Sequence, residues 1–106
     1  MITVSRIKNE YGNYVGFCCS GHAGYAKSGS DIICSAVSAL VINTINSIEA
    51  FTEDKFSCAQ EEKSGRIEFI IVSEVSKESC LLMDSLFLGL KGIERDYGKR
   101  FITVKA

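Results

Sequence analysis

One histidine and one cysteine have the residue types and the spacing for nucleophilic catalysis. His22 is the only histidine and stands in Gly21-His22-Ala23, where a predicted strand ends, and Cys34 follows near the start of a predicted helix. An imidazole can take the proton of a thiol, and the resulting thiolate can attack a carbonyl carbon. Because strand ends and helix starts are often neighbours in small folds, a loop of this length can bring the two side chains together.

Both residues also have a purely structural interpretation. At 100° per residue, Cys34 falls in the same helix stripe as Val37, Val41 and Ile45, and buried cysteines are common and chemically inert. A lone histidine at a strand end is more often a hydrogen-bonded structural residue than a base. The spacing by itself leaves the catalytic and the structural roles open.

A nucleophilic thiol must ionise more readily than a thiol in solution. The ordinary thiol pKa of about 8.5 leaves only a few per cent as thiolate at neutral pH. Lowering such a pKa by about two requires roughly 2.7 kcal/mol, whereas a helix N-terminus usually supplies about 0.3–1 kcal/mol, and at most about 2. A neighbouring imidazolium would supply the rest. Asp31 is expected first to cap the helix, and otherwise to orient the ring of His22.

The positions of the other cysteines predict no metal-binding or other reactive site. Cys18 and Cys19 are adjacent in a predicted strand and point to opposite faces, so they cannot easily hold one ion. No Cys-x-x-Cys spacing is present and there is a single histidine, so we expect neither a metal nor a cofactor. Cys58 and Cys80 are expected to pack in the core.

Three glycines surround the histidine on the loop expected over residues 21–30. Gly21, Gly24 and Gly29 either satisfy tight turns or allow a lid over Ala23–Ser30 to swing across the site. Tyr25 is the one bulky side chain of that lid. No phosphate-binding glycine loop is present.

Seven elements in the order ββαββαβ are expected to position these residues. Alternating and β-favouring residues predict the strands, and apolar residues at helical spacing predict the helices. Ser30 or Asp31 is the expected N-cap of the first helix, and Gly98 the left-handed end of the second. The class is α+β, a single domain over residues 1–106 with a mostly antiparallel sheet and two helices packed on one face. Strands are expected at 2–8, 14–20, 56–62, 66–72 and 101–104, and helices at 32–51 and 77–97.

The inward faces of the two helices follow from the same spacing. The predicted stripe of the first helix is Ile33, Val37, Val41, Thr44, Ile45, Ile48 and Phe51, and that of the second is Met83, Leu86, Phe87, Leu90 and Ile93.

The composition is that of a small cytoplasmic globular protein. Of the 106 residues, 46% are hydrophobic, and 12 basic side chains face 13 acidic ones, which excludes disorder and a clustered cationic surface for nucleic acid. No apolar run approaches the roughly 18–20 residues of a membrane-spanning helix, and no export signal is visible. Five cysteines without such a signal indicate reduced thiols in the cytoplasm, with no membrane partner.

Two linked segments carry a family resemblance. The chain resembles the ribosomal-processing cysteine protease family in Gly21-His22-Ala23 and, after a short glycine-containing loop, in Gly29-Ser30-Asp31-Ile32-Ile33-Cys34-Ser35-Ala36-Val37-Ser38-Ala39. A comparable length and an opening Ile-Thr-Val strand extend the similarity over the whole chain. The resemblance implies a cytoplasmic homodimer that removes a short N-terminal extension from a precursor of the large-subunit ribosomal protein numbered twenty-seven.

The resemblance also implies roles for individual residues. Cys34 would be the nucleophile and His22 the base, with an acyl-enzyme formed and then hydrolysed. Asp31 matches an acidic position of the family motif, Ser38 a polar position that lines the site, and Gly21 a hinge glycine of the loop. Amides at the start of the first helix are candidate oxyanion donors. The lid varies within the family.

Two other functions compete with the peptidase. The first is a non-catalytic ribosome-associated binding module, in which His22 and Cys34 are structural. The second is a thiol redox sensor, which needs an accessible thiolate but no base.

Overall fold

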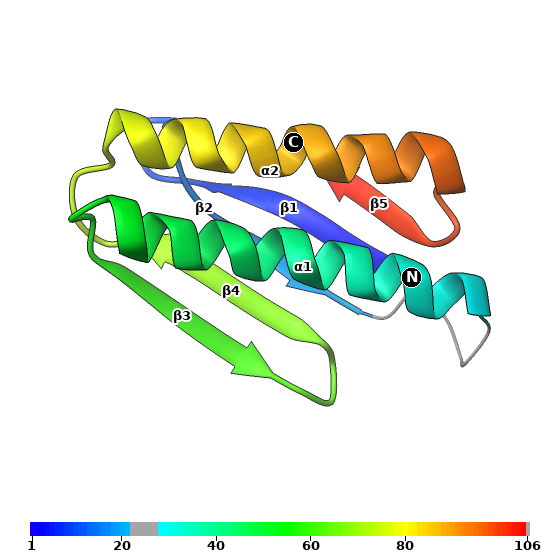
Figure 1. Cartoon of the computed structure of the whole chain (residues 1–106). Helices are drawn as coiled ribbons and strands as arrows, with labels where there is room; N and C mark the ends of the chain where they lie inside the picture. Colours follow the sequence, from blue (N-terminus) through cyan, green and yellow to red (C-terminus); the bar gives the residue numbers. More distant parts are fainter. Residues whose placement is uncertain (22–27, 106) are drawn as a thin grey trace.

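The chain folds into one sheet and two helices, in the order expected from the sequence (Figure 1). The structure is a computed structural model that describes residues 1–21 and 28–105, with side chains omitted at 28–31. The elements are β1 (Ile2–Lys8), β2 (Tyr14–Ser20), α1 (Ser28–Phe51), β3 (Phe56–Glu61), β4 (Arg66–Ile71), α2 (Lys77–Tyr97) and β5 (Ile102–Lys105).

The strands form a five-stranded sheet in the order β3-β4-β2-β1-β5. Neighbouring strands are antiparallel except β1 and β5, which run parallel, with Ile2 opposite Ile102. Both helices lie side by side on one face of the sheet (Figure 1). The predicted α+β class, mostly antiparallel sheet and one-sided helix layer are therefore confirmed.

The core lies between the sheet and the helix layer. Alternate residues of each strand face the helices, which is why β2 buries Val15, Phe17 and Cys19. Phe17 stacks on Phe69 of β4 with ring centroids 5.1 Å apart and meets Phe87 of α2 edge-on at 6.5 Å. These aromatic contacts join the two central strands to α2.

The first helix begins earlier than expected. α1 starts at Ser28 rather than at Ile32, so Gly29, Ser30 and Asp31 lie inside the helix and the predicted N-cap at Ser30 or Asp31 is wrong. The apolar periodicity begins only at Ile32. The first turn before it is polar, so the sequence pattern could not predict it. Short polar and acidic residues suit that turn, because its amides have no intrahelical acceptor and the helix dipole favours a negative charge there.

The predicted inward-facing stripe of α1 is confirmed for most of the helix, but the prediction is wrong at the last residue of the helix. Ile33, Val37, Val41 and Ile48 are buried, whereas Phe51 is 76% exposed. A 24-residue helix is about 36 Å long, while a seven-residue strand spans only about 23 Å. The helix is therefore longer than the strands that it covers, and its buried stripe ends at Ile48, before Phe51.

The second helix has the bounds predicted from the sequence. Ser76 is its N-cap and accepts a hydrogen bond from the Ser79 amide, and Gly98 ends it. The φ of Gly98 is positive, at 101°, but its ψ of 155° lies outside the left-handed helical region. Met83, Leu86, Phe87 and Leu90 are buried as expected, and Ile93 is partly buried against them.

One expectation about apolar segments is wrong. Within the described residues, Ile32–Phe51 of α1 is long and apolar enough to cross a membrane by length and composition. The sequence contains no unbroken apolar run, because serine, threonine and asparagine interrupt it, yet the average over the segment is high. A helix that covers a sheet in a globular domain passes the same test, and the buried stripe of α1 has that role here.

Candidate active site

Cys34 lies in the second turn of α1 and is half-buried against the core. The sequence placed it in the first turn, and the earlier helix start accounts for the difference. The effect of a helix dipole falls off within the first turn, and Cys34 lies beyond that turn. The amides without intrahelical partners are those of residues 28–31, one turn before Cys34.

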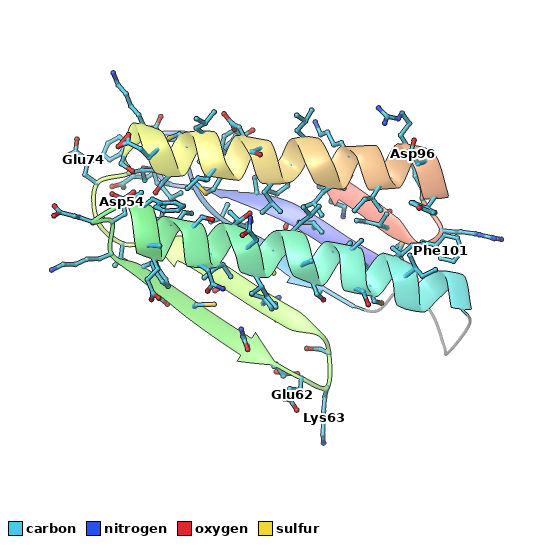
Figure 2. The ribbon with its side chains drawn as sticks, in the orientation of Figure 1. Asp54, Glu62, Lys63, Glu74, Asp96 and Phe101 are labelled. Atoms are coloured by element: carbon cyan, nitrogen blue, oxygen red, sulfur yellow. The ribbon has the colours of Figure 1, made fainter. Side chains whose placement is uncertain are left out.

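A cavity of about 210 Å³ opens beside Cys34. It lies where the start of α1, the end of β2 and the turn of the β3–β4 hairpin meet, and Figure 2 shows Glu62 and Lys63 at that turn. Its apolar side chains include Ile2, Val37, Val41 and Ile67, and its polar ones include Ser38, Gln60, Glu61, Glu62 and Arg66. The arrangement suits an apolar side chain of a ligand whose backbone passes along a polar rim.

Gly21 closes β2 beside this cavity in a conformation that favours glycine. Its φ is 90°, and its amide donates a hydrogen bond to the Ser64 carbonyl at 2.8 Å. A Cβ at this position would lie 2.2 Å from the Met1 carbonyl oxygen. The backbone immediately before His22 is therefore anchored to both β1 and the hairpin turn.

The other predicted site residues divide into those the structure describes and those it does not. Ser38 lies one turn after Cys34, is exposed and lines the cavity, as expected. His22, Gly24 and Tyr25 lie outside the described residues. Asp31 and Gly29 are described only as backbone of the first turn of α1, and the predicted lid is wrong in its last three residues because Ser28–Ser30 are helical.

Cys19 lines the same cavity as Cys34, an arrangement that the sequence alone made improbable. The signal was the alternation in β2, which puts Cys19 on the core-facing side with Val15 and Phe17. Burial, together with the charges of Cys18 and Cys34, raises the pKa of Cys19 to about 11. Cys19 is therefore a protonated thiol at neutral pH.

The two remaining predicted core cysteines are exposed. Cys58 lies on edge strand β3 and Cys80 on α2, so their expected packing is wrong. β3 is an edge strand on which Ser57, Ala59 and Gln60 are exposed as well, and Cys80 lies at the exposed edge of the α2 face that buries Ser79 and Met83. Across the residues that the structure describes, no three His, Cys, Asp or Glu side chains gather in a metal-binding group.

Comparison with known proteins identifies the family. A family model described as cysteine protease Prp matches residues 1–102. The chain belongs to the Prp cysteine protease family. It is therefore an enzyme of the ribosomal-processing cysteine protease group, as the sequence motif indicated, and this membership disfavours a non-catalytic binding module.

Individual Prp proteins resemble the chain over nearly its full length. The ribosomal processing cysteine protease Prp of Staphylococcus aureus is 26% identical over 99 residues, which is 93% of both chains. The Bacillus subtilis Prp is 28% identical over 82 residues, covering 74% of this chain and 73% of its own. The crystal structure of S. aureus Prp with a covalently linked product peptide matches with a TM-score of 0.86 at 26% identity, covering 99% of this chain and 98% of that one.

Proposed function

We propose that this Prp protein removes the short N-terminal extension of a large-subunit ribosomal protein precursor, with Cys34 as nucleophile and His22 as base. The observation that carries the proposal is the position of Cys34 on the wall of a cavity with an apolar interior and a polar rim. A peptidase nucleophile needs this combination of a reachable thiol and adjoining space for substrate.

The family relationship supports the same assignment. The S. aureus relative is a ribosomal processing protease whose structure holds a covalently linked product peptide. A covalent link to a peptide is what an acyl-transfer mechanism through a cysteine generates. Apolar and aromatic residues near the cut, which the family resemblance implies, would fit the interior formed by Ile2, Val37 and Ile67.

The chemistry proceeds in two halves. His22 takes the proton of Cys34, the sulfur bonds to the scissile carbonyl carbon, and the protonated His22 returns the proton to the departing amine. Water, deprotonated by His22, then attacks the acyl-enzyme and releases the second product with Cys34 restored. Amides of the first turn of α1 are the oxyanion donors that we propose, because they have no intrahelical acceptors.

Three further residues have supporting roles in this proposal. Asp31, in the first turn of α1, orients the ring of His22. Ser38 contributes its hydroxyl at the cavity wall, where a peptide backbone would pass. Gly21 fixes the direction in which the chain leaves β2 toward His22, through its bond to Ser64 and its contact with Met1. Gly24 and Tyr25 belong to the proposed substrate-covering segment, whereas Gly29 lies in the first turn of α1.

The decisive experiment is cleavage of a synthetic peptide that spans the ribosomal extension. Cys34→Ala is expected to keep the fold and to lower the turnover rate by at least about 10³-fold, because removing a nucleophile removes the covalent pathway. His22→Ala is expected to lower turnover and to change its pH profile. Cys58→Ala is the matched control, since this cysteine is exposed and lies outside the cavity. Wild-type turnover by Cys34→Ala would overturn the assignment.

We also propose that the protein is a cytoplasmic homodimer. The support is the family resemblance together with the five cysteines, none of which forms a disulfide. Light scattering of the purified protein at micromolar concentration is expected to give twice the chain mass of 11.6 kDa. A monomer mass at all concentrations would contradict this proposal while leaving the peptidase assignment intact.

A further inference from the structure

The cavity beside the catalytic thiol contains a second thiol. Cys19 of β2 is 6% exposed and faces the helix layer, and half-buried Cys34 of α1 lines the same space. The other three cysteines, Cys18, Cys58 and Cys80, are not among the lining residues. Cys18 is next to Cys19 in sequence but points to the opposite face of the sheet, because side chains alternate along a strand.

We propose that Cys19 is a redox modification site, at which it forms a disulfide with Cys34 after a hydroperoxide has oxidised Cys34, so that the protease is switched off reversibly. The proposal rests on the proposed function in that Cys34 is the nucleophile whose loss stops cleavage. It goes beyond that function because Cys19 has no part in peptide hydrolysis.

The chemistry consists of two balanced steps. The Cys34 thiolate attacks one oxygen of the hydroperoxide; an S–O bond forms, the O–O bond breaks, and the departing hydroxide or alkoxide takes a proton from solvent. Cys19 then loses its proton and attacks the Cys34 sulfur, so that an S–S bond forms and the S–O bond breaks, and the departing hydroxide carries the Cys19 proton away as water. Two thiols are oxidised to a disulfide, and one hydroperoxide is reduced.

The different surroundings of the two thiols explain why Cys34 reacts with the hydroperoxide and Cys19 reacts in the second step. Cys19 is only 6% exposed, whereas Cys34 is half-buried, so oxidant reaches Cys34 first. Burial raises the pKa of Cys19 to about 11. Cys19 therefore stays protonated at neutral pH, at which Cys34 would cleave peptide. Because the attacking species is the thiolate, the second step is expected to be faster at pH 9 than at pH 7.

Formation of the disulfide has a structural consequence for the cavity. A disulfide holds its two Cα atoms about 4.4–6.8 Å apart. The bond would therefore join the start of α1 to the end of β2 across the space that Ile2 and Val37 also line. Cleavage stops both because the nucleophile is consumed and because the cavity is closed.

The test treats the reduced, full-length protein with hydrogen peroxide and maps its cysteines by mass spectrometry without added reductant. The expected product is a Cys19–Cys34 cross-link, two hydrogen masses lighter than the reduced pair. It should form more rapidly at pH 9 than at pH 7 and disappear on addition of dithiothreitol. Peptidase activity, expressed relative to each sample before oxidation, should fall and return in parallel with the cross-link.

Two matched variants separate this inference from alternatives. Cys18→Ala removes the neighbouring thiol on the opposite face and is expected to leave the cross-link and its reversal unchanged. Cys19→Ala is expected to give no cross-link, with Cys34 passing instead to sulfinic acid and activity failing to return with dithiothreitol. The cross-link in the unsubstituted protein is measured independently of whether Cys19→Ala folds.

The outcomes also distinguish this inference from the proposed function. A cross-link in a protein that never cleaves the ribosomal peptide would support the redox site and reject the peptidase assignment. Cleavage that depends on Cys34, with stepwise oxidation of Cys34 and no Cys19 cross-link, would overturn the redox site alone. A cross-link from Cys34 to Cys18, Cys58 or Cys80 would also overturn it.

Discussion

At the residue scale, Cys34 and Cys19 show how position gives identical side chains different surroundings. Both line one cavity, but Cys34 comes from the start of a helix and Cys19 from a buried strand position. Neither of these positions follows from the spacing of the cysteines in the sequence. The helix stripe and the strand alternation, taken together, would have placed both side chains between sheet and helix layer.

Gly21 gives a residue-scale prediction. Gly21→Ala places a Cβ 2.2 Å from the Met1 carbonyl oxygen at a φ of 90°, so we expect a loss of about 1–3 kcal/mol in stability and a fall in peptidase activity. Gly12→Ala is the matched control, because Gly12 also has a positive φ, of 82°, but nothing lies within 4 Å of its added Cβ. Urea denaturation should show a clearly larger loss for Gly21→Ala, and equal losses would contradict the clash.

At the element scale, the connection between α1 and β3 is held to the start of α2 by one carboxylate. Asp54 accepts hydrogen bonds from the Ser76 amide, the Ser76 hydroxyl and the Ser79 hydroxyl. Burial by itself would raise the pKa of Asp54, but the hydrogen bonds from Ser79 and Ser76 outweigh it and hold the pKa below its ordinary value. Figure 2 shows Asp54 at the end of the molecule where α1 finishes and α2 begins.

The lowered pKa of Asp54 predicts the direction of a pH effect. A carboxyl whose pKa is lower in the folded state stabilises the fold above its ordinary pKa, near 4, and loses that contribution as the pH falls through the folded value. Asp54→Asn is expected to lower the free energy of unfolding by about 1–3 kcal/mol at pH 7, because it disturbs part-buried hydrogen bonds to a carboxylate, and by progressively less below pH 4. Glu53→Gln, at the exposed neighbour, is the control. If urea unfolding gave the same stability difference between Asp54→Asn and the unsubstituted protein at every pH, this explanation would be contradicted.

The elements were largely predictable because their patterns are local. The bounds of α2 follow from Ser76 and Gly98, which mark both ends in the sequence. The start of α1 did not follow, since its first turn is polar and carries no periodicity. The cavity also did not follow, because it depends on the strand order β3-β4-β2-β1-β5, which brings residue 2 and residue 67 to the same space as Cys34.

At the scale of the whole molecule, the central phenylalanine links sheet and helices. Phe17 is fully buried and contacts Phe69 and Phe87. Phe17→Ala is expected to cost about 3–5 kcal/mol, and Phe17→Leu to cost less, since it retains most of the packing. Phe51→Ala removes the same ring at a 76% exposed position and should change the urea midpoint little. Equal losses of stability for Phe17→Ala and Phe51→Ala would contradict the central position of Phe17 in the core.

The parallel pairing of β1 with β5 joins two segments of the chain that are far apart in the sequence. Ile2 lines the cavity from β1, and the outer edge of that strand is covered only by Ile102–Lys105. Without β5, one edge of β1 would expose unpaired backbone amides and carbonyls. β5 contributes no residue to the cavity lining, so it acts on the site through β1: weakening this pairing is expected to loosen the strand that carries Ile2.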